Sequence, residues 1–417
     1  MMKPLAWAAA GLLVLLALYV LVVVILAGRE AAMVKDRFEE ALAWTAFDYE
    51  SSADGTGPLH ALAVWPKDRR PLRLLVLMHG YSESAADYFS AACHWARRGR
   101  MVVVPDMRGR VSALRYPLEL LEGRRPLGLR VPGWRSMLAR MVTPAAEGRF
   151  VSAGRPDSGG LEVHDIRDAV LEARRRLGDR LEAGTDIIGY SGGGTSALLA
   201  AIRFPGLFER VVAFFPIVDF AAQEAHLRRL GRGPRAQLHD WLGRPGEQPG
   251  RFAARRLLEA LDNLRGASTL VLGDSEDEIC PAAQLRELAR RAAAVPSVEV
   301  RISKPGDPVR WRHGTPDEDS PIAVALPDAP PPRPASQRWV VPGYLVMPKL
   351  EVWLGDGQQG LARCELRRDG DAVIVRLDPL EVPAGLTARV RVRGADGRWR
   401  ERRVVPVRGE DVVFSAR

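Results

Sequence analysis

The sequence predicts an α/β domain with a mainly parallel, doubly wound sheet, preceded by an N-terminal transmembrane helix and followed by a small, sandwich-like all-β domain. Three observations lead to this prediction. Residues 5–27 are apolar and uncharged, residues 49–303 alternate short apolar runs with longer amphipathic stretches, and β-type runs separated by turns follow residue 338. With 417 residues the chain is longer than one ordinary domain, so at least two folded units are expected.

The composition is that of a globular protein and excludes several classes. Hydrophobic residues make up 47% of the chain and charged residues 27%, which argues against global disorder, a collagen-like repeat and a multi-span membrane protein. The net charge of +9 comes mostly from arginine, with only five lysines among 60 basic residues, and it is spread among 51 acidic residues. Because no nucleic-acid-binding motif accompanies this charge, we expect no nucleic-acid partner.

The three cysteines, Cys93, Cys280 and Cys364, are far apart in the sequence. They form no CxxC pair and lack the histidine spacing of a zinc site. They therefore predict neither a disulfide framework nor a metal site, although the count leaves room for one internal disulfide. We expect neither a metal nor another cofactor.

The apolar segment 5–27 is expected to be a membrane anchor. Its 23 uncharged positions would form a helix of about 34 Å, enough to cross a hydrocarbon core of about 30 Å. We therefore expect a single-pass membrane protein whose folded body lies outside the cytoplasm. The alternative is a cleaved signal peptide, but its apolar region is usually shorter, and Ile25 fits poorly upstream of a cut after Ala27.

Six apolar runs are the expected strands of the α/β sheet. They cover residues 72–78, 101–104, 186–190, 211–215, 268–272 and 298–302. Residues 161–177 are expected to be helical, because Val163, Ile166 and Val170 share one face and arginines occupy the last turn. Residues 196–204 are expected to form the helix after the third of these strands.

A proline-rich segment separates this domain from the C-terminal one. Four prolines between residues 328 and 336 predict an extended linker. Five β-type runs follow, at residues 350–354, 372–377, 387–392, 402–405 and 411–414, with Asp-Gly turns at 356–357, 369–370 and 396–397. The expected division is an anchor over 1–28, a catalytic domain over 29–327 with an insertion at 111–158, the linker over 328–336 and an antiparallel sandwich over 337–417.

The strongest local signal is the sequence GYSGGG at residues 189–194. It contains G-x-S-x-G directly between an apolar strand and an apolar helix. A sharp strand-to-helix turn presents the hydroxyl of such a serine above the sheet, and Gly189 and Gly193 are expected because side chains there would collide with the neighbouring strand or helix. The pattern predicts Ser191 as a nucleophile.

A serine nucleophile requires an acid and a base, which we expect after it in the chain. Residues 273–281 read GDSEDEICP and follow an expected strand. We favour Asp277, which lies four residues before Pro281, as the acid; Asp274 and Glu276 are alternatives.

The base is expected to be His313. It follows the last expected strand of the sheet, and no other histidine occurs after the acidic segment. Chain order therefore selects it.

Two backbone N–H groups are expected to form an oxyanion hole. One belongs to Gly192, and Tyr81 supplies the other from the loop after the first expected strand, where Gly80 allows a close approach. His79 is expected to pack and bond locally rather than to transfer protons. Tyr81 and Tyr190 are candidates to lend a hydroxyl or a ring face to the pocket.

Taken together, these stretches resemble the α/β-hydrolase family, specifically its prolyl-oligopeptidase-like and acyl-esterase-like branch. The matching stretches are LMHG at 77–80, VPDMRG at 104–109, GGLEVHDIRDA at 159–169, FPGLF at 204–208 after the serine turn, and 277–281. The resemblance implies Ser191 as nucleophile, Asp277 as acid and His313 as base.

Two features depart from this resemblance. The arginine-rich insertion 111–158 is expected to rim the site or to lie along anionic lipid headgroups. Only about 20 residues separate the apolar segment from the first expected strands, so we expect no large N-terminal propeller of the kind that many oligopeptidases of this branch have. This favours a small ester as substrate over a peptide.

The predicted function is that of a membrane-anchored serine hydrolase that cleaves carboxylic esters through an acyl-enzyme. A peptidase with the same triad and a non-catalytic scaffold that keeps the fold are the alternatives. The oligomeric state is left open.

Overall fold

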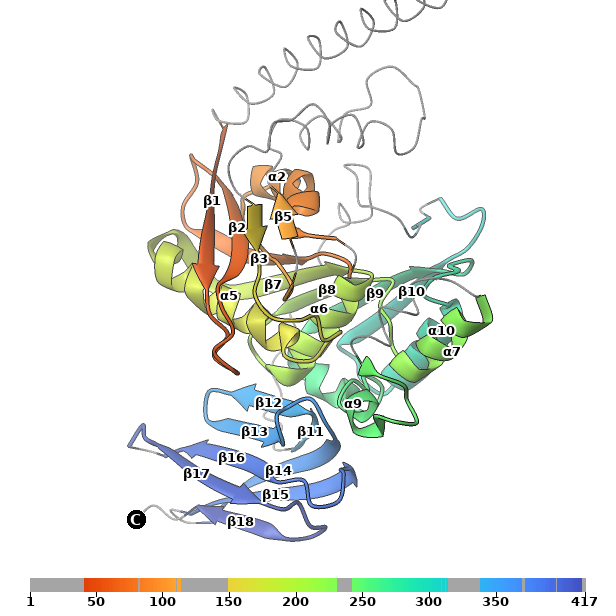
Figure 1. Ribbon diagram of the computed structural model, residues 1–417. Coiled ribbons are helices and arrows are strands. Elements are labelled where there is room, and N and C mark those ends of the chain that lie inside the picture. Colours follow the sequence, from red (N-terminus) through yellow and green to blue (C-terminus); the bar gives the residue numbers. More distant parts are fainter. Residues whose placement is uncertain are drawn as a thin grey trace, which may run out of the picture.

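The computed structural model describes residues 41–113, 149–230, 242–313 and 338–414, apart from residues 82, 110, 309, 312, 370, 371 and 395 within these ranges (Figure 1). The described chain forms an α/β unit and a C-terminal all-β unit, as the sequence predicts. The linker at 328–336 and most of the insertion lie outside the described residues. The exact domain boundaries therefore stay a proposal.

Eight strands form the central sheet in the order β1-β2-β4-β3-β7-β8-β9-β10. Their bounds are β1 (Leu42–Tyr49), β2 (Leu59–Pro66), β3 (Leu72–Met78), β4 (Arg100–Pro105), β7 (Leu181–Tyr190), β8 (Arg210–Phe214), β9 (Ser268–Asp274) and β10 (Val298–Ser303). Neighbouring strands from β4 to β10 are parallel, and β2 pairs antiparallel with both β1 and β4. All six predicted strands are confirmed. The prediction missed β1, a half-buried edge strand without a continuous apolar run, and β2.

Helices cover both faces of this sheet. They are α2 (Phe89–Arg97), α5 (Glu162–Leu177), α6 (Gly192–Arg203), α7 (Phe220–Leu230), α9 (Pro249–Ala253) and α10 (Ala282–Ala292), with short 3₁₀ turns at η1 (Ala85–Tyr88), η2 (Gly178–Arg180) and η3 (Leu261–Gly266). Buried side chains of α5, α6 and α10 share one core and those of α2 and α7 share another. Side chains of β3 alternate between the two, with Leu74 in the first and Leu75 in the second. The inner parallel strands are therefore buried on both faces, whereas the edge strand β10 exposes Glu299 and Arg301.

The C-terminal unit is an antiparallel sandwich. One sheet has the order β11-β14-β15-β18 and the other β12-β13-β16-β17. The bounds are β11 (Arg338–Pro342), β12 (Tyr344–Met347), β13 (Leu350–Leu354), β14 (Leu361–Asp369), β15 (Ala372–Glu381), β16 (Ala388–Arg393), β17 (Trp399–Val404) and β18 (Asp411–Phe414). Inward residues of both sheets, such as Val352 and Val375, pack in one core. The five predicted strands are present; β11, β12 and β14 were not predicted.

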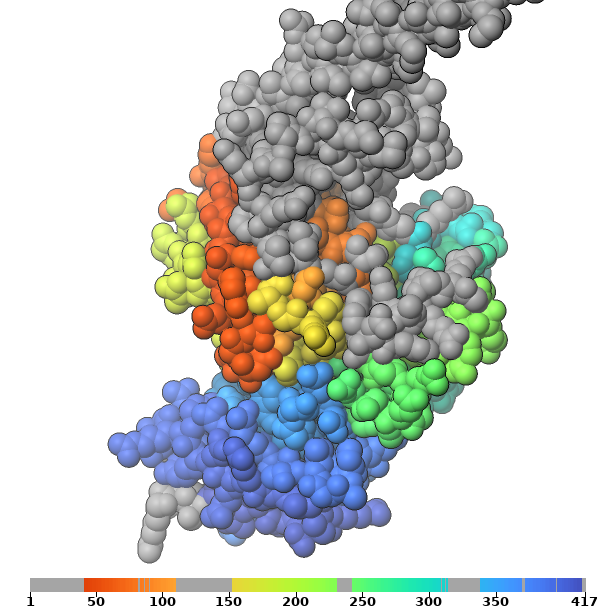
Figure 2. All heavy atoms as spheres, in the orientation of Figure 1, coloured from red at the N-terminus to blue at the C-terminus, as the bar shows by residue number. Residues whose placement is uncertain are grey.

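The sandwich packs directly on the α/β unit. In Figure 2 the blue C-terminal strands meet the green segment around α9, and Gly360 donates its N–H to the carbonyl of Gly250 at 2.8 Å. A buried aromatic cluster lies at this interface, where the rings of Tyr344 and Trp353 stack at 4.7 Å and the His164 ring lies 5.3 Å from Trp353. The two units therefore share part of one core.

Arg203, the last residue of α6, is fully buried at this interface. Its guanidinium donates to the carbonyls of Gly159, Gly160, Ala254 and Pro342 at 2.6–3.0 Å, and it lies 4.5 Å from the centre of the Tyr344 ring. A single side chain thus ties α6, the loop before α5 and the start of the sandwich together.

We expect Arg203→Met to destabilise the whole chain by at least about 3 kcal/mol, because several buried carbonyl groups lose their donor and each costs roughly 1–3 kcal/mol when left unsatisfied. The matched control is Arg175→Met. Arg175 is 68% exposed and pairs with Glu172, so its loss should leave the free energy of unfolding nearly unchanged. Urea denaturation of the full chain measures both values. Equal midpoints for the two variants would contradict the proposed role of Arg203.

The prediction of a single-pass membrane location is wrong. In the part of the chain that the structure describes, no helix combines the length and the apolar character needed to cross a bilayer. The segment 5–27, on which the prediction rested, lies outside the described residues. Within the insertion, β5 (Val111–Ala113) and β6 (Arg149–Val151) pair antiparallel, and residues 114–148 lie outside the described part.

Candidate active site

Ser191 lies at the sharp turn between β7 and α6. Its backbone angles are φ 54° and ψ −121°, a region that costs a non-glycine residue of the order of 1–3 kcal/mol. The Ser191 N–H donates to the carbonyl of Phe214 on the adjacent strand at 2.8 Å. This strained turn is the one that the G-x-S-x-G pattern predicts.

The glycines around Ser191 are required by backbone contacts. A Cβ atom on Gly189 would lie 2.0 Å from the carbonyl oxygen of Gly193, and one on Gly193 would lie 2.2 Å from the carbonyl oxygen of Met78. Such distances are far shorter than a van der Waals contact. The predicted roles of Gly189 and Gly193 therefore have a direct steric basis, which holds the serine turn against the end of β3.

His313 and Asp277 meet at Ser191. The Nε2 atom of His313 lies 3.1 Å from Ser191 Oγ, and its Nδ1 atom lies 2.9 Å from Asp277 Oδ2. The Asp277 side chain is 1% exposed and that of His313 is 12% exposed. The structure thus joins the three residues in one hydrogen-bonded chain, although they are 36 and 122 positions apart along the sequence.

The second oxygen of Asp277 is held by the backbone. Its Oδ1 atom accepts the N–H groups of Ile279 at 2.7 Å and Cys280 at 3.0 Å. These bonds fix the carboxylate so that Oδ2 faces the imidazole. The loop after β9 therefore turns back on itself to orient one carboxylate.

The two alternative acids have a different partner. Asp274 and Glu276 both accept hydrogen bonds from the guanidinium of Arg310, and Arg310 together with Ser303 lowers the pKa of Asp274 to about 2. Arg310 lies three residues before His313. These acids therefore hold the segment that carries the histidine instead of contacting the imidazole.

The imidazole of His313 is also held by aromatic rings. The Phe215 ring lies 5.0 Å from it and the Tyr190 ring 5.7 Å, the latter edge-on. Phe215 has a positive φ of 49°. Tyr190 therefore packs against the imidazole, and the hydroxyl or ring face that we expect it to lend to the pocket stays a prediction.

The predicted oxyanion loop packs on the serine turn. A Cβ atom on Gly192 would lie 2.3 Å from the ring of Tyr81, and one on Gly80 would lie 3.6 Å from Ser191 Cβ. His79 is fully buried and bonds locally, with Nδ1 at 2.9 Å from the Gly80 carbonyl and Nε2 accepting the Met107 N–H at 3.2 Å. The donor roles of Tyr81 and Gly192 stay predictions that this packing favours.

Glu83 is a neighbour of the site that the sequence did not reveal. Its Oε2 atom accepts the Gly80 N–H at 2.7 Å and the Tyr88 hydroxyl at 3.1 Å. Burial raises the pKa of Glu83. Because Glu83 bonds the N–H of Gly80 and His79 bonds its carbonyl, the two residues orient the loop that carries Tyr81. A single loop glutamate offers no sequence pattern that could have identified it.

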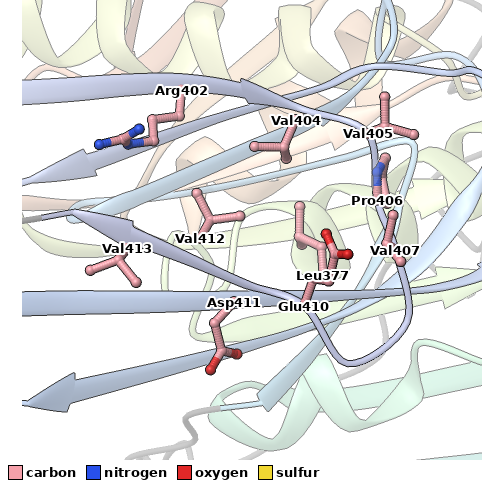
Figure 3. A pocket seen from close by; sticks show the side chains of 10 residues that line it. All are labelled: Leu377, Arg402, Val404, Val405, Pro406, Val407, Glu410, Asp411, Val412 and Val413. Atoms are coloured by element: carbon pink, nitrogen blue, oxygen red, sulfur yellow. The ribbon is translucent and has the colours of Figure 1, made fainter.

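Two hollows in the described residues lie outside this constellation. One of about 200 Å³ opens at the end of the sandwich between β17 and β18, and Figure 3 shows its exposed valines Val405, Val407 and Val413. The other, of about 390 Å³, lies between the two units and is lined by Trp353 and Arg389 among others. Neither contains Ser191 or its partners.

Comparison with known proteins agrees with this fold. The model of a family described as "Putative esterase" matches residues 166–305, a stretch with Ser191 and Asp277. No protein of curated function matches the sequence.

Several solved structures are similar. An esterase of Pyrococcus furiosus is 14% identical, with 63% of this chain and 84% of that chain covered and a TM-score of 0.41. An acylaminoacyl peptidase of Pyrococcus horikoshii is 16% identical, with 68% of this chain and 39% of that chain covered and a TM-score of 0.45. A puromycin hydrolase is 18% identical, with 63% of this chain and 35% of that chain covered and a TM-score of 0.43. The chain thus spans only about two fifths of the peptidase's length.

The family match and the serine turn on a parallel sheet define the class as an α/β-hydrolase fold. The chain resembles a family of esterases, which confirms the esterase-like part of the resemblance inferred from the sequence.

Proposed function

We propose that the protein is a serine hydrolase that cleaves carboxylic esters through an acyl-enzyme. The observation that carries this proposal is the hydrogen-bonded chain from Ser191 through His313 to Asp277. A serine hydroxyl is a weak nucleophile on its own, and an imidazole within hydrogen-bond reach can accept its proton during attack.

The proposed reaction begins when Ser191 Oγ attacks the ester carbonyl and His313 Nε2 takes the hydroxyl proton. Asp277 keeps the other imidazole proton on Nδ1 and stabilises the imidazolium. The N–H groups of Tyr81 and Gly192 bind the oxyanion, the latter at the start of α6, where backbone donors and the helix dipole favour negative charge.

Collapse of the tetrahedral intermediate completes the first half of the reaction. The protonated His313 gives its proton to the leaving alcohol, and the acyl group stays on Ser191. A water molecule then attacks the acyl-enzyme with His313 again as base, which releases the carboxylic acid and restores the hydroxyl. No step requires a metal or an organic cofactor.

We favour an ester over a peptide as substrate because the matched family is described as an esterase. The test compares turnover of short-chain acyl esters with turnover of proline-containing and proline-free peptide amides by the full chain. We expect kcat/KM to be higher for the esters. Preferential amide turnover would replace the esterase proposal with a peptidase that uses the same three residues.

A further inference from the structure

Cys280 is a buried thiol next to the proposed triad. It lies in the loop between β9 and α10 and is 3% exposed, and its N–H donates to Asp277 Oδ1 at 3.0 Å. One ligand atom each from Asp277, Cys280 and His313 lies within 4.8 Å of the others. A sulfur, an oxygen and a nitrogen donor thus converge beside the base.

This donor set matches one class of ion. Thiolate and imidazole ligands favour Zn²⁺ and its softer relatives over Mg²⁺ or Ca²⁺. Bond lengths of about 2.0–2.3 Å to a tetrahedral Zn²⁺ place neighbouring ligand atoms roughly 3.5 Å apart. The ligand atoms lie within 4.8 Å of one another, so a shift of about 1 Å in the loop or the imidazole is enough to reach that spacing.

We propose that Asp277, Cys280 and His313 form a binding site for one thiophilic divalent ion such as Zn²⁺ or Cd²⁺, and that this ion inhibits the enzyme. The inhibitory part rests on the proposed function, whereas the binding part does not. A water molecule completes the fourth position.

The inhibition follows from the tautomer of His313. An ion bound to Nδ1 displaces the proton that Asp277 holds there, and the neutral imidazole then carries its proton on Nε2. That atom faces Ser191 Oγ. It can now donate a hydrogen bond but can no longer accept the serine proton, so the nucleophile is not activated. The Cys280 thiol releases one proton to solvent as it becomes a ligand.

The test measures inhibition of ester hydrolysis by Zn²⁺ in the full chain, with wild type, Cys280→Ala and the control Cys93→Ala. Cys93 is also buried but lies in α2, outside the cluster. We expect reversal by a chelator in the wild type, at least about tenfold weaker inhibition in Cys280→Ala and wild-type inhibition in Cys93→Ala. Equal inhibition of all three proteins would overturn the proposal.

A second measurement does not depend on activity. Titration with Cd²⁺ should produce the ultraviolet absorption of a cadmium–thiolate bond, saturating at one ion per chain, in wild type and Cys93→Ala and not in Cys280→Ala. Persistence of this absorption in Cys280→Ala would refute the site. If Cys280→Ala does not fold, Cys280→Ser replaces it in both measurements. Should the protein hydrolyse no ester, the Cd²⁺ titration still decides whether the ion binds.

Discussion

Replacing Ser191 with alanine is expected to lower kcat for a short acyl ester on the order of 10⁶-fold, because the covalent intermediate can no longer form. The fold should be unaffected, since the alanine is smaller than the serine that already occupies this strained turn. Steady-state hydrolysis and covalent labelling by an active-site-directed fluorophosphonate measure the effect.

The control for this experiment is Ser297→Ala. The Ser297 hydroxyl donates to the carbonyl of Leu264 at 2.9 Å, away from the site. It should keep both activity and labelling. Labelling of Ser191→Ala to the wild-type extent would disprove Ser191 as the nucleophile, and a wild type that neither reacts with the probe nor turns over esters would favour the non-catalytic scaffold.

Asp277→Asn is expected to reduce kcat by about 10⁴-fold, because an amide at this position favours the wrong imidazole tautomer. The amide keeps the size of the carboxylate, so a loss of activity without a loss of structure is the expected signature. Steady-state kinetics together with a thermal unfolding curve separate the two effects.

Asp274→Asn is the matched control, since Asp274 lies in the same loop and bonds Arg310 instead of the imidazole. It should cost far less activity. If Asp274→Asn removes as much activity as Asp277→Asn, the assignment of the acid is wrong.

Asp274→Asn is also expected to change how the stability of the chain depends on pH. The pKa of Asp274 is about 2 in the folded chain because of its bonds to Arg310, below the value of about 3.9 in an unfolded chain. The unfolded state therefore binds more protons between these values, and the stability from this pair is lost as the pH falls from about 4 to about 2. The loss of stability over this pH range should be shallower in Asp274→Asn than in the wild type.

Much of the fold could be predicted because its signals are local. The inner strands β3, β8 and β9 are buried on both faces, so each appears as a nearly continuous apolar run. The strands β1 and β14 are only partly buried, and the exposed residues of β14, Arg363, Arg368 and Asp369, are charged. Their pattern does not stand out from a polar loop, which explains why they were missed.

The candidate site also has a part that the local sequence predicts and a part that depends on tertiary contacts. Ser191 and its glycines were identified from six consecutive residues, because the steric demands of the turn act over that short distance. The choice among Asp274, Glu276 and Asp277 depended on where a loop points. In the structure the backbone N–H groups of residues 279 and 280 turn Asp277 toward His313, while Arg310 holds the other two acids.

The sequence by itself determined the α/β class, the all-β C-terminal unit, the serine turn and the chain order of the proposed triad, because hydrophobic periodicity and turn chemistry act between near neighbours. Only the tertiary structure decided which acid reaches the histidine, that Glu83 braces the loop that carries Tyr81, that Cys280 lies beside Asp277 and His313, and that Arg203 joins the two units. These relations are contacts between segments far apart in the chain, and packing of the sheet and the sandwich brings them together.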